Sequence, residues 1–196
     1  MSDDVLTTSQ IARRDRITTA ALELAAEGGF DAVQMREVAA RADVALGTLY
    51  RYFPSKEYLL VSVMASQIDG LAERLALRPP EGTDPVERVV DVLGRATRAL
   101  ERQPNVNVAM IRALVSGNAD LAPAVSANRD GMRRIITDAL GEESTPDAAA
   151  LDPDRDRAID LLNDVWLAAL VAWITGVQPP GTVLPKLESA ARALLG

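Results

Sequence analysis

Apolar residues repeat every three to four positions along nearly the whole chain, and this spacing constrains the fold more than any other feature. The repeat is clear near the N-terminus, where Ile17, Ala20, Ala21 and Leu24 share one helical face. No segment shows the apolar–polar alternation of a half-buried strand. Gly and Pro divide the repeat into about nine stretches. The sequence therefore predicts an all-α fold of about nine helices.

Local signals mark the ends of the first predicted helices. A Thr-x-x-Gln capping box at 7–10 precedes the first helix, and the two glycines at 28–29 are expected to end it. Two short helices are then predicted over residues 34–42 and 44–53, with a turn at Asp43. Two short helices joined by a tight turn are typical of a helix-turn-helix motif.

The rest of the chain is predicted to form longer helices. Ser55 suits the N-cap of a long fourth helix, and Asp84-Pro85 suits the start of the next after a linker. A loop is expected over residues 141–154, followed by a long helix over residues 156–175. We expect a DNA-binding domain over residues 1–54 and an effector-binding and dimerisation domain over residues 55–196.

Composition excludes several kinds of chemistry. The 196 residues contain no cysteine and no histidine, which removes disulfides, thiolate or imidazole metal ligands and His-based catalysis. The N-terminus is acidic where a signal peptide needs cations. The longest apolar run, over residues 165–177, is shorter than the roughly 20 residues of a membrane span. We expect a cytoplasmic protein with no membrane association.

The segment GTLYRYFPSK at 47–56 gathers three of the five Tyr and Phe residues beside two cations, although the net charge is −7. In a helix-turn-helix motif the second helix enters the major groove with its N-terminal residues at base edges. Small side chains there permit close approach, and hydroxyls and cations reach phosphates or bases. The predicted DNA-binding residues are Gln34, Arg36, Ala45, Leu46, Gly47, Thr48, Tyr50, Arg51, Tyr52 and Lys56.

Ordinary structural roles compete with this interpretation for several side chains. Leu49 and Phe53 lie four residues apart and are expected in the core. Tyr50 fits a core role as well as a phosphate contact. The three arginines at 13–16 add cations to the first helix, but they also fit a solvated face.

Residues 34–60, QMREVAARADVALGTLYRYFPSKEYLL, resemble the DNA-binding signature of the TetR family of bacterial repressors. The resemblance implies a homodimer with a three-helix DNA-binding head on each subunit. It also implies a helical effector domain whose last two helices pair across the dimer. The chain departs from the family pattern at three positions. Gln34 stands where Thr or Ser is common, Ala45 where Ser is frequent, and Arg51 where His is frequent.

A second segment, DVWLAALVAWITG at 164–176, together with the first resembles a TetR subgroup that represses cholesterol catabolism. The resemblance implies a steroid or lipid-derived acyl-CoA thioester as effector. Regulation of a different pathway, such as efflux or other lipid metabolism, is the alternative. Activation instead of repression also stays open at this point.

The effector domain offers apolar candidates for a ligand pocket, since pockets in helical bundles are mostly apolar. Each candidate also fits a plain core position. The predicted lining residues are Met64, Ile68, Leu71, Leu93, Met110, Leu114, Leu170 and Trp173. Arginines that could hold a coenzyme A phosphate are Arg98, Arg102, Arg112, Arg133 and Arg134. The apolar faces of residues 165–174 and 184–194 favour burial in a two-fold dimer.

Enzymatic function finds no support in the sequence. There is no Gly-rich phosphate loop and no cluster of metal ligands. Asp152, Asp154 and Asp156 resemble the start of a calcium loop, but Arg157 stands where that loop needs Gly and Asn163 where it needs Glu. We expect a regulator that is not an enzyme and needs no cofactor. A purely structural scaffold would leave the hydroxyls and cations of 48–56 unexplained.

Overall fold

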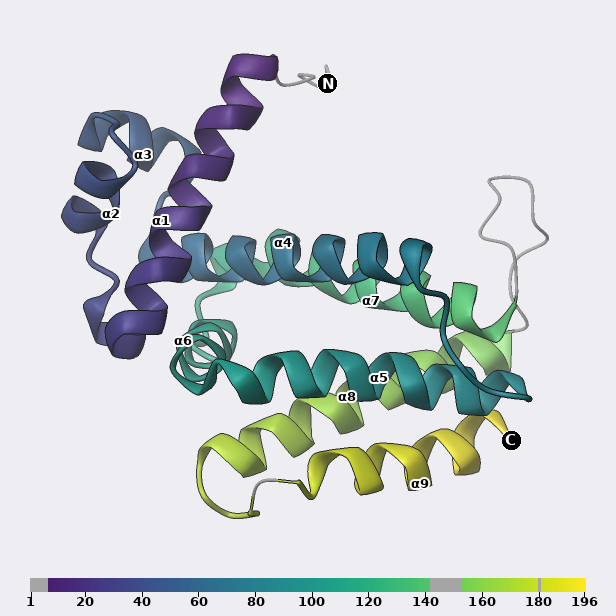
Figure 1. Cartoon of the computed structure of the whole chain (residues 1–196). Helices are drawn as coiled ribbons and strands as arrows, with labels where there is room; N and C mark the ends of the chain where they lie inside the picture. The colour runs from purple at the N-terminus through teal and green to yellow at the C-terminus, as the bar shows by residue number, and fades with distance from the viewer. Residues whose placement is uncertain (1–6, 142–152, 180) are drawn as a thin grey trace. The chain divides into compact units, whose positions relative to one another are not determined.

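The computed structural model describes residues 7–141, 153–179 and 181–196, and helices make up most of these ranges (Figure 1). No strand occurs in the described ranges, so the all-α prediction is confirmed. Most of the predicted loop at 141–154, the acidic N-terminus and Asp152 lie outside them. The elements are α1 (Thr8–Ala32), α2 (Met35–Arg41), α3 (Leu46–Tyr52), α4 (Lys56–Leu77), α5 (Pro85–Arg102), α6 (Pro104–Leu114), the 3-10 helix η1 (Ala119–Leu121), α7 (Ala122–Leu140), α8 (Pro153–Ile174) and α9 (Val183–Leu195).

These helices form two compact units. The first unit runs to Ser66 and includes Gln103–Val125, and the second unit combines Gln67–Arg102 with Ser126–Gly196. The units are defined by packing, whereas the predicted boundary between residues 54 and 55 divides the chain by function. That functional division stays a prediction.

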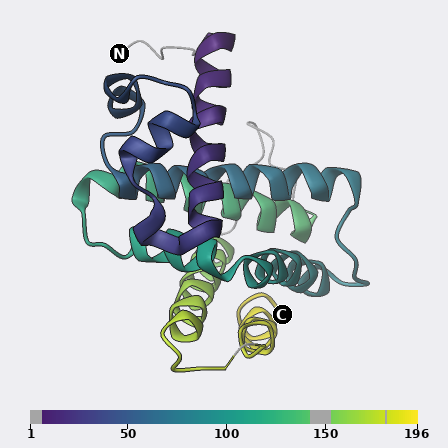
Figure 2. The ribbon, with the colours of Figure 1, turned by 60° about the vertical axis from the view of Figure 1, so that its left-hand side comes forward.

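In the first unit, α6 and α2 both pack against α1 (Figure 2). The predicted capping box is confirmed, because Thr7 Oγ1 accepts from the Gln10 amide and the Gln10 side chain accepts from the Thr7 amide. Gly28 and Gly29 leave helical geometry, with φ of 68° at Gly29, so the long helix ends there and only a short helical turn follows. Buried alanines on both α1 and α6 remove side-chain bulk, which allows two helices to approach closely.

The turn between α2 and α3 is closed by backbone hydrogen bonds. The amide of Asp43 donates to Ala40 O at 3.2 Å, and that of Val44 donates to Ala39 O at 3.0 Å. This pair of bonds defines a Schellman motif, which usually has glycine at the left-handed position. Here Asp43 occupies it with φ of 52°. The predicted turn at Asp43 is therefore confirmed.

In the second unit, α9 packs against both α8 and α5. Asp84 caps α5 as predicted, because its Oδ1 accepts from the Glu87 amide at 2.8 Å. Arg88 fastens α5 to the end of α7 by donating from Nε to Ala139 O at 2.8 Å. Trp166 Nε1 donates to Thr97 Oγ1 at 3.2 Å, which joins α8 to α5.

The helix predicted over residues 156–175 begins earlier than expected, because α8 starts at Pro153. Proline is suited to the first helical position, where its missing N–H is not needed. Asp154 and Asp156 follow in the first turn, where carboxylates favour the positive end of the helix dipole. The prediction placed Pro153 and Asp154 at the end of the loop over residues 141–154 and began the helix at Asp156, three residues after the observed start.

Candidate functional site

Helix α3 is held in the first unit by two apolar side chains. Leu49 and Phe53 are both fully buried, so their predicted core role is confirmed. The guanidinium of Arg14 lies 5.0 Å from the centre of the Phe53 ring, and the Tyr52 ring lies 6.4 Å from it. This packing fixes α3 by one side and leaves its other side facing outward.

None of the ten predicted DNA-binding residues is buried, and all lie in the first unit. Gln34, Arg36, Ala45, Gly47, Tyr50 and Arg51 are exposed, and Leu46, Thr48, Tyr52 and Lys56 are half-buried.

The space around Gly47 decides how closely α3 can approach a nucleic acid. A Cβ atom built on it would meet no described heavy atom within 4 Å, so internal packing does not require glycine there. The outward face of α3 therefore combines small residues, hydroxyls and a cation with free space beside Gly47. Such a face can dock against a nucleic-acid groove.

Lys56 is engaged within the protein. Its Nζ donates to Phe30 O at 3.1 Å and lies 3.9 Å from the centre of the Phe30 ring. The guanidinium of Arg112 lies 4.4 Å from the same ring. Phe30 thus joins α1, α4 and α6, a structural role that the sequence pattern did not show. A phosphate contact by Lys56 stays a prediction, and it would compete with this packing.

Two other predicted candidates make internal contacts. Gln34 leaves its helix without a side-chain cap, and its Nε2 donates to Asp31 O at 2.8 Å. Arg16 Nε donates to Ala42 O at 3.3 Å, which ties α1 to the end of α2. Among the arginines of the first helix, Arg14 and Arg16 therefore have structural contacts within the unit.

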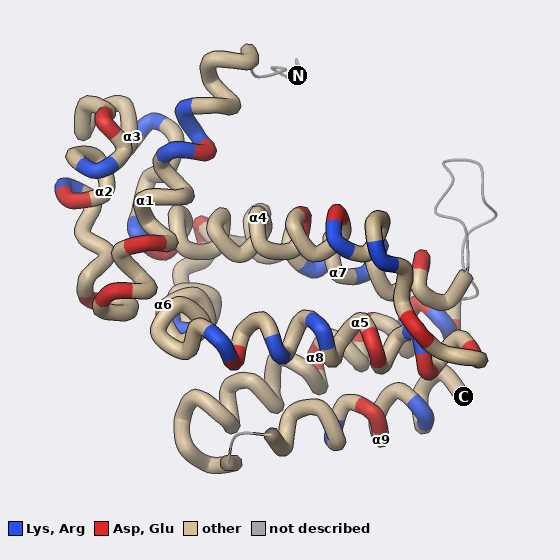
Figure 3. Tube along the Cα trace, in the orientation of Figure 1, with Lys and Arg blue, Asp and Glu red and all other residues tan. Residues whose placement is uncertain are grey.

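Charge is distributed unevenly along the chain. Residues 8–56 contain seven of the 21 basic residues but only six of the 28 acidic ones. Figure 3 shows Lys and Arg on α1, α2 and α3. Arg41 is neutralised locally, because it binds Glu27 at 2.5 Å, and this hydrogen bond lowers the pKa of Glu27 and raises that of Arg41. The head region can therefore face a polyanion although the whole chain is acidic.

The predicted effector-lining residues are divided between the two units. Met64, Met110 and Leu114 belong to the first unit, and Ile68, Leu71, Leu93, Leu170 and Trp173 belong to the second. Leu71, Leu93, Met110 and Leu170 are buried, and the other four are half-buried. Their assignment to a ligand pocket stays a prediction.

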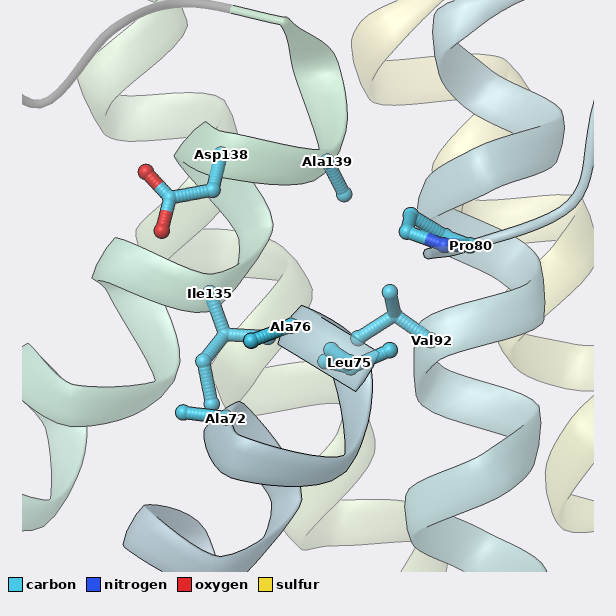
Figure 4. A pocket seen from close by; sticks show the side chains of 8 residues that line it. All are labelled: Ala72, Leu75, Ala76, Pro80, Val92, Ile135, Asp138 and Ala139. Atoms are coloured by element: carbon cyan, nitrogen blue, oxygen red, sulfur yellow. The ribbon is translucent and has the colours of Figure 1, made fainter. Parts of the chain in front are cut away.

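The second unit contains a cavity of about 210 Å³ lined by other residues. It lies among α4, α5 and α7 and the linker at Pro80 (Figure 4). The Asp138 carboxylate points away from Val92 and Leu75, so the interior is apolar. Typical ligand pockets measure roughly 300–1,000 Å³, so this cavity is small for an acyl-CoA. Its lining residues are Ala72, Leu75, Ala76, Pro80, Val92, Ile135, Asp138 and Ala139.

Two of the arginines predicted to hold a coenzyme A phosphate already bind carboxylates. Arg112 binds Asp31 at 3.2 Å in the first unit. In the second unit Arg133 of α7 binds Asp156 at 2.9 Å and Asp160 at 2.6 Å, both on α8. Although burial opposes it, the two carboxylates keep the pKa of Arg133 raised. The remaining three, Arg98, Arg102 and Arg134, are exposed.

Two buried asparagines were missed by the sequence analysis. The Asn107 amide in α6 is fully buried, and neither Nδ2 nor Oδ1 has a hydrogen-bond partner among the described residues. The Nδ2 of Asn163 in α8 is also buried and has no hydrogen-bond partner among the described residues. Both residues stand within apolar helical stripes, and the only available signal was one polar residue interrupting each stripe.

The calcium-loop pattern does not form a loop in the described residues. Asp154 and Asp156 lie in the first turn of α8, where they bind Arg157 at 2.6 Å and Arg133 at 2.9 Å. No group of three potential metal ligands occurs among the described residues. No helix among them is long and apolar enough to cross a membrane.

The fold and the outward face of α3 define a helix-turn-helix DNA-binding regulator. Two family profiles match the chain: the tetR family of bacterial regulatory proteins over residues 17–63, and the tetracyclin repressor-like C-terminal domain over residues 82–194. The chain belongs to the tetR family. This confirms the resemblance read from residues 34–60.

Repressors named KstR are similar to this chain over nearly its whole length. The transcriptional repressor KstR of Rhodococcus jostii is 42% identical over 195 residues, which is 99% of this chain and 88% of the relative. KstR of Mycolicibacterium smegmatis is 39% identical over 191 residues, which is 96% of this chain and 89% of that relative. The likeness predicted from two segments therefore extends to KstR repressors along nearly the whole chain. The predicted general function, a ligand-responsive DNA-binding repressor, is confirmed.

Solved structures agree in fold. A TetR regulator from Rhodococcus sp. RHA1 superposes with a TM-score of 0.85 at 36% identity, covering 95% of this chain and 97% of that one. The FadR repressor of Thermus thermophilus, solved in complex with lauroyl-CoA, superposes with a TM-score of 0.68 at 25% identity, covering 93% of each chain.

Proposed function

We propose that this chain represses transcription as a homodimer that binds a palindromic operator. The observation that carries the proposal is the outward face of α3, which is anchored by Leu49 and Phe53 and leaves the predicted contact residues of α3 unburied. Two such helices about 34–36 Å apart read half-sites one DNA turn from each other.

Each accessible residue has a defined role in this proposal. Ala45 and Gly47 let the start of α3 approach the base edges, and Thr48 hydrogen-bonds there while Leu46 contacts a thymine methyl group. Tyr50 and Tyr52 donate to phosphate oxygens. Arg51 reaches a base or a phosphate. The remaining three contacts, from Gln34, Arg36 and Lys56, fix the position of the head on the DNA backbone.

Dimerisation is supported by apolar side chains that the single chain leaves uncovered on α8 and α9. Leu161 is 51% exposed, and Val165 and Leu167 on α8 are half-buried. On α9, Leu184 and Leu194 are half-buried, whereas Leu187 is fully covered within the second unit. A two-fold pairing of these helices would cover the same patch on both subunits.

The effector in this proposal is an apolar molecule, a steroid or another lipid-derived acyl-CoA thioester. The lauroyl-CoA complex of Thermus thermophilus FadR supports an acyl-CoA thioester over a drug-efflux ligand. The predicted lining residues supply the apolar surface. The protein acts on DNA in the cytoplasm, performs no catalysis and needs no cofactor.

Contacts in the first unit supply a route from an effector to the DNA-binding head. α6 is fastened to α1 by Asn105, whose Nδ2 donates to Ala26 O at 3.1 Å, and by the Arg112–Asp31 ion pair. A displaced α6 therefore moves α1 and changes the spacing of the two α3 helices. Effector and operator must then weaken each other's binding by the same factor.

The first experiment is a selection from random double-stranded DNA with the purified protein at two salt concentrations. An enriched palindrome is expected, and affinity should fall steeply with salt because phosphate contacts release counterions. Variant Arg51→Gln should enrich an altered site or none. Failure to enrich any sequence, before and after refolding from denaturant to remove bound ligand, would contradict the proposal.

A further inference from the structure

Helix α6 has two faces with different surroundings. Asn105 and Arg112 lie on one face and bind α1. At about 100° per residue, Asn107 points roughly 140–160° away from both of them. Asn107 therefore belongs to the opposite face of α6.

That opposite face is apolar except for Asn107. Met110, Ile111 and Leu114 lie within about 60° of Asn107 around the helix. Met110 and Ile111 are buried, and Leu114 is half-buried. Met110 has three rotatable bonds, so its side chain can move to make room for a bound molecule. An apolar wall with one polar group is the usual composition of a small-molecule site.

Asn107 is fully buried, and neither side of its amide has a hydrogen-bond partner among the residues that the structure describes. Buried polar groups in proteins are nearly always hydrogen-bonded, because an unpaired donor or acceptor away from water is costly. Leucine has almost the same shape and would carry no such penalty. The amide therefore has a use that packing of the described residues does not provide.

We propose that Asn107 recognises an oxygen atom of the effector, a ketone or hydroxyl group on an otherwise apolar molecule. The inference rests on the proposed function and adds the specificity residue to it. Nδ2 donates a hydrogen bond to the oxygen of a ketone or a hydroxyl, and Oδ1 can accept a hydrogen bond from a hydroxyl. Plain acyl chains leave both atoms unpaired, so the protein distinguishes oxygenated ligands from unoxidised ones of the same size.

The test compares wild type with Asn107→Leu, using Asn105→Ala on the other face of α6 as the matched control. The probes are the coenzyme A thioester of a keto-steroid acid and the same thioester without the ring ketone. For each protein, the thioester concentration that releases half of the bound operator is measured. Thermal unfolding of the ligand-free proteins is recorded in parallel.

Wild type should respond to the keto thioester at a concentration about tenfold or more below that of the deoxy thioester, since one buried amide is paired only by the ketone. Asn107→Leu should abolish this ratio and raise Tm by about 2–4 °C. Asn105→Ala should keep the ratio and lower Tm, although both half-release concentrations should change together because Asn105 belongs to the proposed route from effector to head.

An unchanged ratio in Asn107→Leu, or a lowered Tm, would overturn the inference, because the amide would then be serving the fold or a bound water. If neither thioester releases wild type from its operator, the inference and the proposed steroid effector both fail. Operator binding by wild type in the same assay tests the DNA-binding proposal separately.

Discussion

Helices α3 and α8 differ in whether their polar and charged side chains are bound within the protein. α3 has seven residues and carries small, hydroxyl and cationic side chains into open space, with Gly47 unobstructed. α8 has 22 residues, and its carboxylates at Asp156 and Asp160 are bound by Arg133 of α7. Charge and polarity on α3 are thus available to a ligand, whereas on α8 they are used within the fold.

The difference shows why a polar residue cannot be assigned to function by its type alone. Arg51 and Arg133 have the same side chain, but the structure gives Arg133 two carboxylates and leaves Arg51 exposed, with its guanidinium 5.9 Å from the Tyr52 ring. Removal of each should therefore affect a different property. The following variants test that separation, in order of expected effect.

Gly47→Ala should give the largest loss of operator affinity, roughly 10–100-fold, because the added methyl group obstructs the close approach of α3 to the bases. The same change should raise the free energy of unfolding by about 0.5–1 kcal/mol, since alanine favours the helix. Titration of labelled operator and urea denaturation measure the two effects. Gly70→Ala in α4 is the control and should keep full affinity. Normal affinity in Gly47→Ala would mean that α3 does not dock closely.

Arg51→Gln should weaken operator binding about tenfold and leave thermal stability unchanged, because the side chain makes no ion pair with any described residue. If Arg51 binds a phosphate, the slope of log affinity against log salt should become shallower by about 0.9. Tyr52→Phe is the matched control because it removes an uncharged hydroxyl. It should weaken operator binding without changing the slope. An unaltered slope in Arg51→Gln together with changed sequence preference would assign this residue to a base.

Arg133→Gln should lower the free energy of unfolding by about 1 kcal/mol, because it breaks a two-carboxylate pair that is only partly shielded from water. Operator affinity measured well below Tm should not change. Arg134→Gln, exposed on the same helix, is the control and should have little effect on stability. If Arg133→Gln instead impaired effector response with normal stability, this arginine would belong to a ligand site.

The ion pair between Glu27 and Arg41 should give the smallest effect, visible as a pH dependence. Its hydrogen bond holds the pKa of Glu27 below the ordinary value of 4.5, so the contribution to stability is present above that value and disappears as pH falls through the lowered pKa. Tm of wild type and Glu27→Gln should differ slightly near neutral pH and converge in acid. Convergence at high salt is also expected, because both side chains are exposed. A difference that persists in acid would show that the side chain of Glu27 acts by packing.

The sequence by itself determined the helical fold, the helix-turn-helix and the outward face of α3. These follow from local rules: helical spacing, a capping box at Thr7, glycines at the end of α1 and a turn at Asp43. The burial of Leu49 and Phe53 also followed, because residues four apart share one side of a helix. Short-range geometry therefore suffices for the region that we propose to contact DNA.

Only the tertiary structure decided how residues distant in sequence are used. It placed Lys56 on Phe30, 26 residues away, and paired Arg133 with Asp160, 27 residues away. It also buried the Asn107 amide without a partner among the described residues. Contacts of this kind depend on which helix faces meet, and the spacing of apolar residues within one helix carries no information about the neighbouring helix.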